Sequence, residues 1–373
     1  MAEPVRPYAT WVEVDLQAIR DNVRRVVEQS GVAVMAIVKA DGYGHGSVAV
    51  ARAALQGGAT WLGVARLEEA LELRQAGFQT PILLLGNLSK AQMAYAIQAD
   101  LSITVWTCEQ IEALEHYASQ LGRKAQVHLK IDTGMGRIGV LPQDAPNLAR
   151  QLAHSKHLVW EGVFTHFARA DESNPAPTDQ QLERFRFALE QMRPVFPPSL
   201  RIHAANSAAA LTRRDALFDM VRLGIAMYGL HPSSACPLPS AFKPALSWKT
   251  ILSHVKRLPP GEGISYGHIY TTKTTERIGT LPLGYADGFR RWQGNRVLVR
   301  GKKVPVIGRV CMDQCMVQLD EVPEAEAGDE VVIIGKQGDQ QITAEEVAST
   351  WRTINYEVVC GIGKRVPRIY VNS

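Results

Sequence analysis

Short apolar segments alternate with helical segments along the first two-thirds of the chain. The apolar segments are rich in β-branched residues and lie at 33–39, 61–65, 82–86, 101–106, 126–133, 160–166, 199–207 and 220–229. Between most of them Ala, Leu, Glu and Arg recur every three to four residues, which predicts helices, for example at 47–55, 67–75, 109–120 and 180–192. Strands that are apolar throughout are typical of parallel sheets buried on both faces. Strand–helix alternation repeated about eight times over roughly 200 residues predicts a (β/α)8 barrel of the TIM type. A doubly wound open sheet is the structural alternative.

The pattern changes at residues 231–244, a segment rich in Pro and Ser that shows no periodicity and predicts a linker. The strand-like runs that follow are separated by Gly or Pro, and one helix is expected at 342–351. This pattern predicts a mainly antiparallel β-domain. We therefore predict two domains, a barrel at 1–235 and a C-terminal β-domain at 236–373. The strand-like segment near residue 10 fits either domain.

Composition and charge narrow the class of protein. The 373 residues include 41 Lys and Arg against 37 Asp and Glu, for a net charge of +4, without a run of basic residues. This balance argues against nucleic acid as a partner, because phosphate binding needs a basic surface. No apolar stretch approaches the ~18 residues of a membrane span, and the N-terminus lacks the apolar core of a secretory signal. The cysteines number five, an odd count that argues against a disulfide framework. We expect a cytoplasmic protein without a metal site, since the C-x3-C spacing of Cys311 and Cys315 matches neither a redox pair nor half of a usual zinc site.

Residues 134–139 match the G-x-G-x-x-G pattern and follow a predicted strand. A dinucleotide site needs a helix that opens within the glycines on the first βα turn. Here the chain continues as a loop through Pro142, and several βα units come first. We therefore interpret the glycines as a sharp turn that brings Arg137 back toward a strand end.

Polar residues stand where the predicted barrel strands end. Lys39, Arg137, His166 and Ser207 each follow an apolar segment, and the C-terminal strand ends form the active-site face of such barrels. A lysine among apolar groups loses its proton readily and becomes a nucleophile. The glycine-rich turn after Lys39 allows close approach to a phosphate, and Tyr43 offers a hydroxyl. Together these groups suit an anionic carbonyl cofactor. Singly, Lys39 also fits a surface lysine and Ser207 a helix N-cap.

Sequence segments throughout the chain identify a family resemblance. They are, in order, AIVKADGYGHG, IDTGMGRIG, FTHFARAD, HAANSAA, VRLGIAMYG, GISYG, PLGYADGFRR, GRVCMDQ and NYEVVC. On these segments the chain resembles the alanine racemase family of pyridoxal 5′-phosphate enzymes, which combine a barrel with a β-domain. The difference we note is Asp41-Gly42, which replaces an Asn-Ala pair common in the family. The resemblance implies interconversion of L-alanine and D-alanine, which supplies D-alanine for peptidoglycan.

The resemblance also implies a mechanism with two bases. Lys39 would hold the cofactor as an aldimine and act on the D-face of the substrate, and Tyr266 would act on the L-face. A hydrogen-bond chain would run from Tyr266 to His166 and then to Arg222, which His203 would support.

Further roles carry over from the family to matching positions. The residues implied for the cofactor phosphate are Tyr43, Ser207, Gly224, Ile225 and Tyr356. Arg137 would contact the cofactor and the substrate carboxylate, which the Met312 amide would also hold. Lys130, carbamylated in many relatives, would position Arg137. Cys311 and Asp313 would line the substrate site, and the implied entrance gate consists of Asp171, Tyr285 and Arg290.

The family forms a head-to-tail homodimer, so the resemblance implies that Tyr266 and Met312 reach the site of the partner subunit. Three alternatives also contain a barrel of this kind. A racemase of broader or serine specificity is the nearest. A basic amino-acid decarboxylase would place a carboxylate at the cofactor ring nitrogen, where Arg222 stands here. A non-catalytic pyridoxal-phosphate homeostasis protein is a bare barrel and lacks a β-domain.

Overall fold

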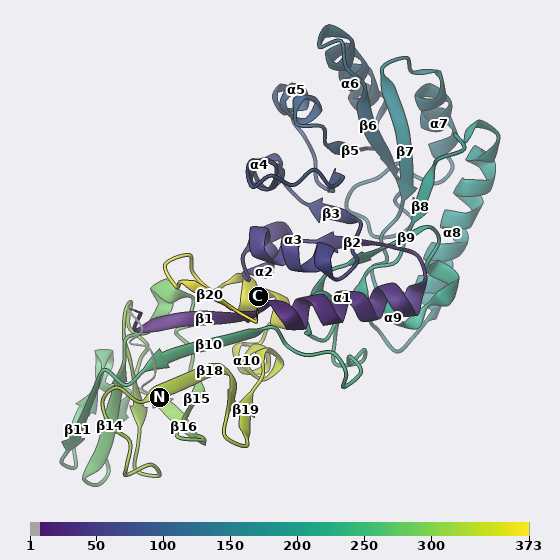
Figure 1. The fold of residues 1–373 in the computed structure, drawn as a ribbon. Helices are drawn as coiled ribbons and strands as arrows, with labels where there is room; N and C mark the ends of the chain where they lie inside the picture. Colours follow the sequence, from purple (N-terminus) through teal and green to yellow (C-terminus); the bar gives the residue numbers. More distant parts are fainter. Residues whose placement is uncertain (1–7, 373) are drawn as a thin grey trace. The chain divides into compact units, whose positions relative to one another are not determined.

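The computed structural model describes residues 8–372, which separate into two compact units (Figure 1). The first unit comprises residues 17–243, and the second combines the segment up to Leu16 with Pro244 onward. Residues 1–7 lie outside the described residues. The N-terminal segment that was predicted to lack a secretory signal begins with these residues. Among the described helices, none combines the length and the apolarity needed to cross a membrane.

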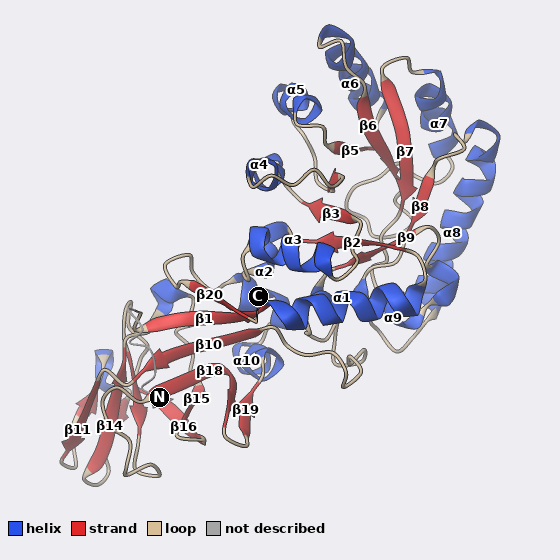
Figure 2. Cartoon of the chain, in the orientation of Figure 1, coloured by secondary structure: helices blue, strands red, loops and turns tan. Residues whose placement is uncertain are grey.

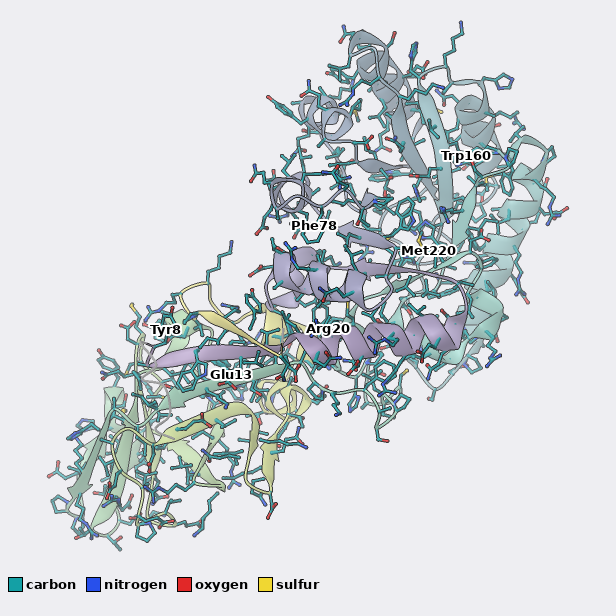
Figure 3. All side chains as sticks on the ribbon, in the orientation of Figure 1. Tyr8, Glu13, Arg20, Phe78, Trp160 and Met220 are labelled. Carbon is teal, nitrogen blue, oxygen red and sulfur yellow. The ribbon has the colours of Figure 1, made fainter. Side chains whose placement is uncertain are left out.

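The division differs from the predicted boundaries 1–235 and 236–373 at the N-terminus, and its internal boundary lies between residues 243 and 244, at the end of the predicted linker. Strand β1 (Thr10–Asp15) pairs antiparallel with β10 (Leu246–Ile251) and parallel with β20 (Arg368–Val371). The first strand therefore belongs to the sheet of the second unit, because a strand is held by its hydrogen-bonded neighbours. Glu13 of β1, labelled in Figure 3, adds an ion pair with Lys249 of β10 at 3.0 Å.

The first unit is a nearly closed barrel of parallel strands. These strands are β2 (Ala33–Ile37), β3 (Trp61–Val64), β4 (Ile82–Leu84), β5 (Ser102–Val105), β6 (Ala125–Lys130), β7 (Leu158–Phe164), β8 (Arg201–His203) and β9 (Met220–Leu223). Successive strands pair in parallel, and β9 returns to pair with β2. The Arg222 N–H donates to the Ala205 carbonyl at 2.9 Å and so links β9 to the chain after β8. The predicted (β/α)8 barrel is confirmed, since an open doubly wound sheet would not follow the chain order around a ring.

Helices follow most of the barrel strands and lie outside them (Figure 2). In chain order the helical segments are α1 (Leu16–Ser30), which precedes β2, the short turn α2 (Lys39–Tyr43), and then α3 (Ser47–Gln56), α4 (Leu67–Gln75), α5 (Lys90–Gln98), α6 (Cys108–Gln120), α7 (Ala145–His154), α8 (Ala176–Met192) and α9 (Ser207–Thr212). Helix α6 shows how the sequence sets a boundary. Thr107 Oγ1 accepts the Gln110 N–H at 3.2 Å, and the Gln110 side chain accepts the Thr107 N–H at 3.2 Å, which forms a capping box. Trp160 of β7 and Met220 of β9, labelled in Figure 3, are buried in this unit.

The second unit is mainly antiparallel, as predicted. Its large sheet has the order β11 (His254–Leu258), β14 (Glu276–Leu281), β17 (Cys315–Gln318), β16 (Lys302–Ile307), β15 (Arg296–Val299), β18 (Glu330–Gln337), β10, β1 and β20, with β19 (Gln340–Ile342) paired to β18. A separate hairpin joins β12 (Gly263–Ile264) to β13 (Tyr270–Thr271). The unit also holds helices α10 (Ala344–Trp351) and α11 (Asn355–Cys360). Its core includes Phe289, which makes edge contacts with Trp248 and Trp351 at ring distances of 6.0 and 6.1 Å.

Candidate functional site

Lys39 begins a turn of unusual handedness at the end of β2. The next residues have positive φ angles, of 53° at Ala40, 54° at Asp41, 58° at Gly42 and 53° at Tyr43. Helix α2 is therefore a left-handed turn, a conformation that costs roughly 1–2 kcal/mol for each residue other than glycine. Such a costly backbone persists only where the surroundings hold it, and it occurs often at functional sites.

The carboxylate of Glu69 is one of the groups that hold this turn. Its Oε1 accepts the N–H of Ala40 at 2.7 Å, directly after Lys39. Its Oε2 accepts the N–H groups of Ala65 and Arg66 at 2.8 and 3.1 Å, at the end of β3. Glu69 thus ties the lysine turn to the adjacent βα loop.

Ser207 does not cap its helix, so the N-cap alternative is wrong. The cap of α9 is Asn206, whose Oδ1 accepts the Ala209 N–H at 3.1 Å. The buried hydroxyl of Ser207 instead accepts the N–H groups of Gly224 and Ala226 at 2.9 and 3.4 Å.

A tight cluster of neutral polar groups surrounds Gly224. A Cβ atom built on Gly224 would lie 3.0 Å from the Tyr43 hydroxyl oxygen and 3.8 Å from Ser207 Oγ. Ile225 follows and begins the short 3-10 helix Ile225–Tyr228. The cluster combines hydroxyls with the start of a helical turn, which is a donor set suited to a phosphate. Four of the five residues predicted for the phosphate are in this unit, whereas Tyr356 lies on α11 of the other unit.

Arg222 of β9 is a buried hydrogen-bonding centre, with 3% of its surface exposed. Its Nη1 lies 2.8 Å from His203 Nδ1, and its Nη2 lies 3.2 Å from His166 Nδ1. Burial, together with the charge of Arg137, lowers the pKa of Arg222 to about 9, so the guanidinium keeps its proton at neutral pH. Burial and the charge of Arg222 hold the pKa values of His166 and His203 well below the usual value, so both rings are neutral. The structure thus joins His166, Arg222 and His203 in the predicted order, and their roles stay predictions.

Lys130 ends β6 in a buried position. Its Nζ donates to the Ile131 carbonyl at 3.1 Å and lies 5.1 Å from the centre of the Phe164 ring. Burial lowers the pKa of Lys130 to about 7, and the charge of Arg222 acts in the same direction. The amine is therefore partly unprotonated at neutral pH and can act as a nucleophile.

Arg137 lies exposed on the loop that follows β6. The loop begins at Asp132, whose Oδ1 accepts the N–H groups of Gly134, Met135 and Gly136 at 3.0, 2.9 and 3.1 Å. The next helix, α7, begins only at Ala145. The glycine-rich segment is therefore a loop, as predicted, and lacks the helix start that a dinucleotide site needs.

The second unit carries a pocket of about 820 Å³ lined by Tyr266, Cys311, Met312 and Asp313. Tyr266 is 69% exposed and Met312 is 53% exposed. Ser265, which precedes the tyrosine, donates its hydroxyl to a backbone carbonyl at 2.6 Å and lies 3.3 Å from the sulfur of Cys311. The structure therefore brings these four predicted residues together on this unit, whereas Arg137, also predicted to bind the substrate, belongs to the first unit.

The residues predicted for the entrance gate are divided between the units. Tyr285 and Arg290 belong to the second unit, and Asp171 belongs to the first. The Tyr285 N–H donates to the Cys311 carbonyl at 3.0 Å, and Arg290 forms an ion pair with Glu357. Tyr285 therefore lies next to Cys311, which lines the pocket. The entrance gate as a whole stays a prediction.

Sequence reasoning missed Glu69 and Glu161, two carboxylates that bind groups of the first unit. Glu69 carries a detectable signal, because it stands three residues after the N-cap of α4 in a capping-box position. Glu161 accepts hydrogen bonds from the side chains of Ser102 and His128. His128 stands two residues before Lys130, and period-two spacing places both on one face of β6.

Two family models match the chain. The model described as "Alanine racemase, N-terminal domain" matches residues 14–232, and "Alanine racemase, C-terminal domain" matches residues 245–370. The second match covers most of the β-unit, which the bare-barrel alternative lacks. A curated relative named alanine racemase, from Symbiobacterium thermophilum, is 49% identical over 365 residues that cover 97% of each chain.

Solved structures agree with these matches. The crystal structure of alanine racemase from E. faecalis is 45% identical, with a TM-score of 0.91 over 97% of this chain and 98% of that chain. Alanine racemase from Bacillus anthracis, solved with bound L-Ala-P, is 43% identical, with a TM-score of 0.92 over 99% of this chain and 97% of that chain.

Proposed function

This chain belongs to the alanine racemase family, and on that premise we propose that it interconverts L-alanine and D-alanine with pyridoxal 5′-phosphate as cofactor. The observation that carries the proposal is the hydrogen-bonded group of His166, Arg222 and His203, in the same unit as the strained turn of Lys39. We further propose that the protein is cytoplasmic and supplies D-alanine for peptidoglycan.

The polar groups of the first unit fit this cofactor. A Cβ atom at Gly224 would crowd the Tyr43 hydroxyl at 3.0 Å, and hydroxyls and amides suit a phosphate. We propose that these groups hold the phosphate together with Ile225 and with Tyr356 of the other unit. When bound, the cofactor supplies an aldehyde that condenses with amines and a ring that accepts the electrons left by the α-proton.

Arg222 fits the nitrogen of that ring. A guanidinium has donors only, so it favours a ring nitrogen that is unprotonated and can accept a hydrogen bond. The decarboxylase alternative needs a carboxylate at this position, and Arg222 stands there instead. We propose that Arg222 thereby limits the electron demand of the ring, which disfavours side reactions.

Lys39 and Tyr266 are the proposed bases. Lys39 holds the cofactor through its amine and exchanges the α-proton on the D-face of the substrate. The phenolic oxygen of Tyr266 exchanges the proton on the L-face. A phenol is a weak acid, so we propose that His166, held by Arg222, stabilises the form that takes up the proton.

Arg137 and the backbone N–H of Met312 are the proposed ligands of the substrate carboxylate, since both are donors. We propose that Lys130, as a carbamate anion, positions Arg137. Cys311 and Asp313 line the same pocket as Met312, and Tyr285 stands beside it. A narrow entrance formed by Tyr285, with Arg290 and Asp171, would favour a small side chain.

We propose a head-to-tail homodimer in which a second copy supplies Tyr266 and Met312 to the site. Their exposure, 69% and 53%, supports this, because apolar side chains beside a pocket commonly mark an interaction surface.

The reaction is tested with L-alanine in D2O and purified holoenzyme. Loss of optical rotation together with deuterium at the α-carbon is expected, and borohydride treatment of the holoenzyme should abolish both. A change with serine but none with alanine would contradict the proposed substrate.

The dimer is tested by mixing two inactive variants, Lys39→Ala and Tyr266→Phe. Each mixed dimer then has one site with both bases intact, so random exchange should restore about a quarter of the active sites. No restored activity after proven subunit exchange would show that Tyr266 acts within its own chain.

A further inference from the structure

A line of hydrogen-bonded side chains leads from Arg222 through the barrel to a carboxylate. Arg222 Nη1 lies 2.8 Å from His203 Nδ1, and His203 Nε2 lies 3.0 Å from His128 Nδ1. His128 Nε2 lies 3.3 Å from Glu161 Oε2, which also accepts the Ser102 hydroxyl at 2.6 Å. We name these five residues the Arg222–Glu161 relay.

The chemistry of the arginine determines the direction of each hydrogen bond in the relay. A guanidinium only donates, so His203 accepts at Nδ1. A neutral imidazole that accepts at one nitrogen carries its proton on the other, so His203 Nε2–H donates to His128 Nδ1. By the same reasoning, His128 Nε2–H donates to the Glu161 carboxylate. Both rings are neutral, because burial lowers the pKa values of His203 and His128.

The backbone is adapted to this contact. Strands β6 and β7 shift register at this point, since Val127 pairs with Trp160 and His128 pairs with Gly162, which leaves Glu161 as an extra residue. Such a bulge redirects a side chain. A Cβ atom built on Gly162 would fall 2.3 Å from His128 Nδ1. The irregular pairing and the glycine thus both make room for the imidazole and its carboxylate.

The relay also meets the electrostatic need of the buried arginine. Within residues 8–372, no carboxylate forms an ion pair with Arg222. A buried charge without compensation is costly, and the charge of Arg137 adds to the positive charge around Arg222. Glu161 is the carboxylate at the end of the hydrogen-bond line, and the charge of Arg201 also acts on it.

We propose that Glu161 is a positioning residue for Arg222 and serves as its remote counter-ion through two neutral histidines. This rests on the proposed function only in that Arg222 faces the cofactor ring nitrogen. The arrangement balances the charge of the guanidinium from a distance. Its Nη2 donates to the Thr165 and Ala204 carbonyls at 2.7 and 2.8 Å, and no carboxylate competes for the remaining donors of the guanidinium.

Neutron diffraction from holoenzyme crystals exchanged into D2O tests the relay directly. Deuterons are expected on Nε2 and absent from Nδ1 in both His128 and His203. Deuterons on both nitrogens of either ring, or on Nδ1 of His203, would overturn the proposal. This result does not depend on turnover, so it separates failure of the relay from failure of the proposed racemase activity.

Variants of Glu161 test its effect on the cofactor. Glu161→Leu removes the terminal acceptor and should shift the absorbance maximum of the bound cofactor and weaken cofactor retention at least tenfold. Glu161→Gln keeps an acceptor oxygen and should restore most of both properties. Exposed Glu112 on α6 provides the matched control, Glu112→Leu, with no expected shift. A folded Glu161→Leu protein with unchanged absorbance and retention would contradict the proposal, and the neutron result stands if that variant fails to fold.

Discussion

Lys130 is expected to react with carbon dioxide, because its environment favours the neutral amine. Burial and the charge of Arg222 lower its pKa from 10.5 to about 7. Near neutral pH about half of the amine is therefore unprotonated, against about one part in 3000 for an ordinary lysine, a gain on the order of a thousandfold in nucleophile. The nitrogen lone pair attacks the carbon of CO2, a carbamate N–C bond forms, and the amine proton leaves to solvent.

The surrounding charges favour the product as well as the nucleophile. The guanidinium groups of Arg222 and Arg137 both lower the pKa of the ammonium form, and the same charges attract the carbamate anion. Asp132 acts in the opposite direction. An anion between these arginines relieves a cluster of like charges, so the modification should be stable in the folded protein and lost on unfolding.

Carbon NMR of the native protein in 13C-bicarbonate measures the carbamate. One protein-bound carbamate signal is expected, which Lys130→Met abolishes. Lys156→Met, at an exposed lysine of the same unit, should leave it unchanged. If the folded wild-type protein shows no signal in saturating bicarbonate, or if the signal survives Lys130→Met, the reasoning from burial and charge is refuted.

Three further predictions concern stability and reactivity. Glu69→Ala removes the acceptor of three backbone N–H groups and should lower the free energy of unfolding by about 2–3 kcal/mol, whereas exposed Glu68→Ala should change it by less than about 0.5 kcal/mol; equal calorimetric effects would contradict this. Asn22→Ala removes two donated and one accepted hydrogen bond in the first unit and should cost about 1–3 kcal/mol, so an unchanged Tm would count against it. Burial raises the pKa of the Cys315 thiol, so iodoacetamide should modify exposed Cys108 in the native protein and Cys315 only after unfolding; mass spectrometry of the peptides would reveal native modification of Cys315 if this is wrong.

The barrel could be predicted because the features that define it appear locally in the sequence. A parallel strand buried on both faces must be apolar, and its neighbour must be reached through a crossover, so the pattern along the chain follows the pattern around the ring. The strand Thr10–Asp15 had no such guide. Its buried residues Trp11, Val12 and Val14 do not follow a regular alternation, and its partners lie more than 200 residues away, so the sequence did not determine the unit to which this strand belongs.

The candidate site was predictable to a similar extent. Lys39, Arg137 and His166 could be named as candidates because strand ends converge in a barrel, whatever the spacing in sequence. The left-handed backbone at Ala40 and Asp41 was not predictable, since alanine disfavours positive φ and the turn depends on contacts made elsewhere. Long-range contacts of this kind also determine the positions of Glu69 and Glu161.

The interior of this barrel contains a line of hydrogen-bonded polar side chains. Such interiors are usually filled by layers of branched apolar side chains, yet here Arg222, His203 and His128 form a buried polar line that reaches Glu161. Polar groups buried in this way seldom stabilise a fold as well as apolar packing does. The hydrogen-bonded line is therefore better explained by a role in positioning Arg222 than by a contribution to stability. Each of its hydrogen bonds removes a rotational choice from the next side chain. We therefore expect the orientation of Arg222 to depend on Glu161 through two imidazole rings, in addition to the direct hydrogen bonds of Arg222 to the Thr165 and Ala204 carbonyls.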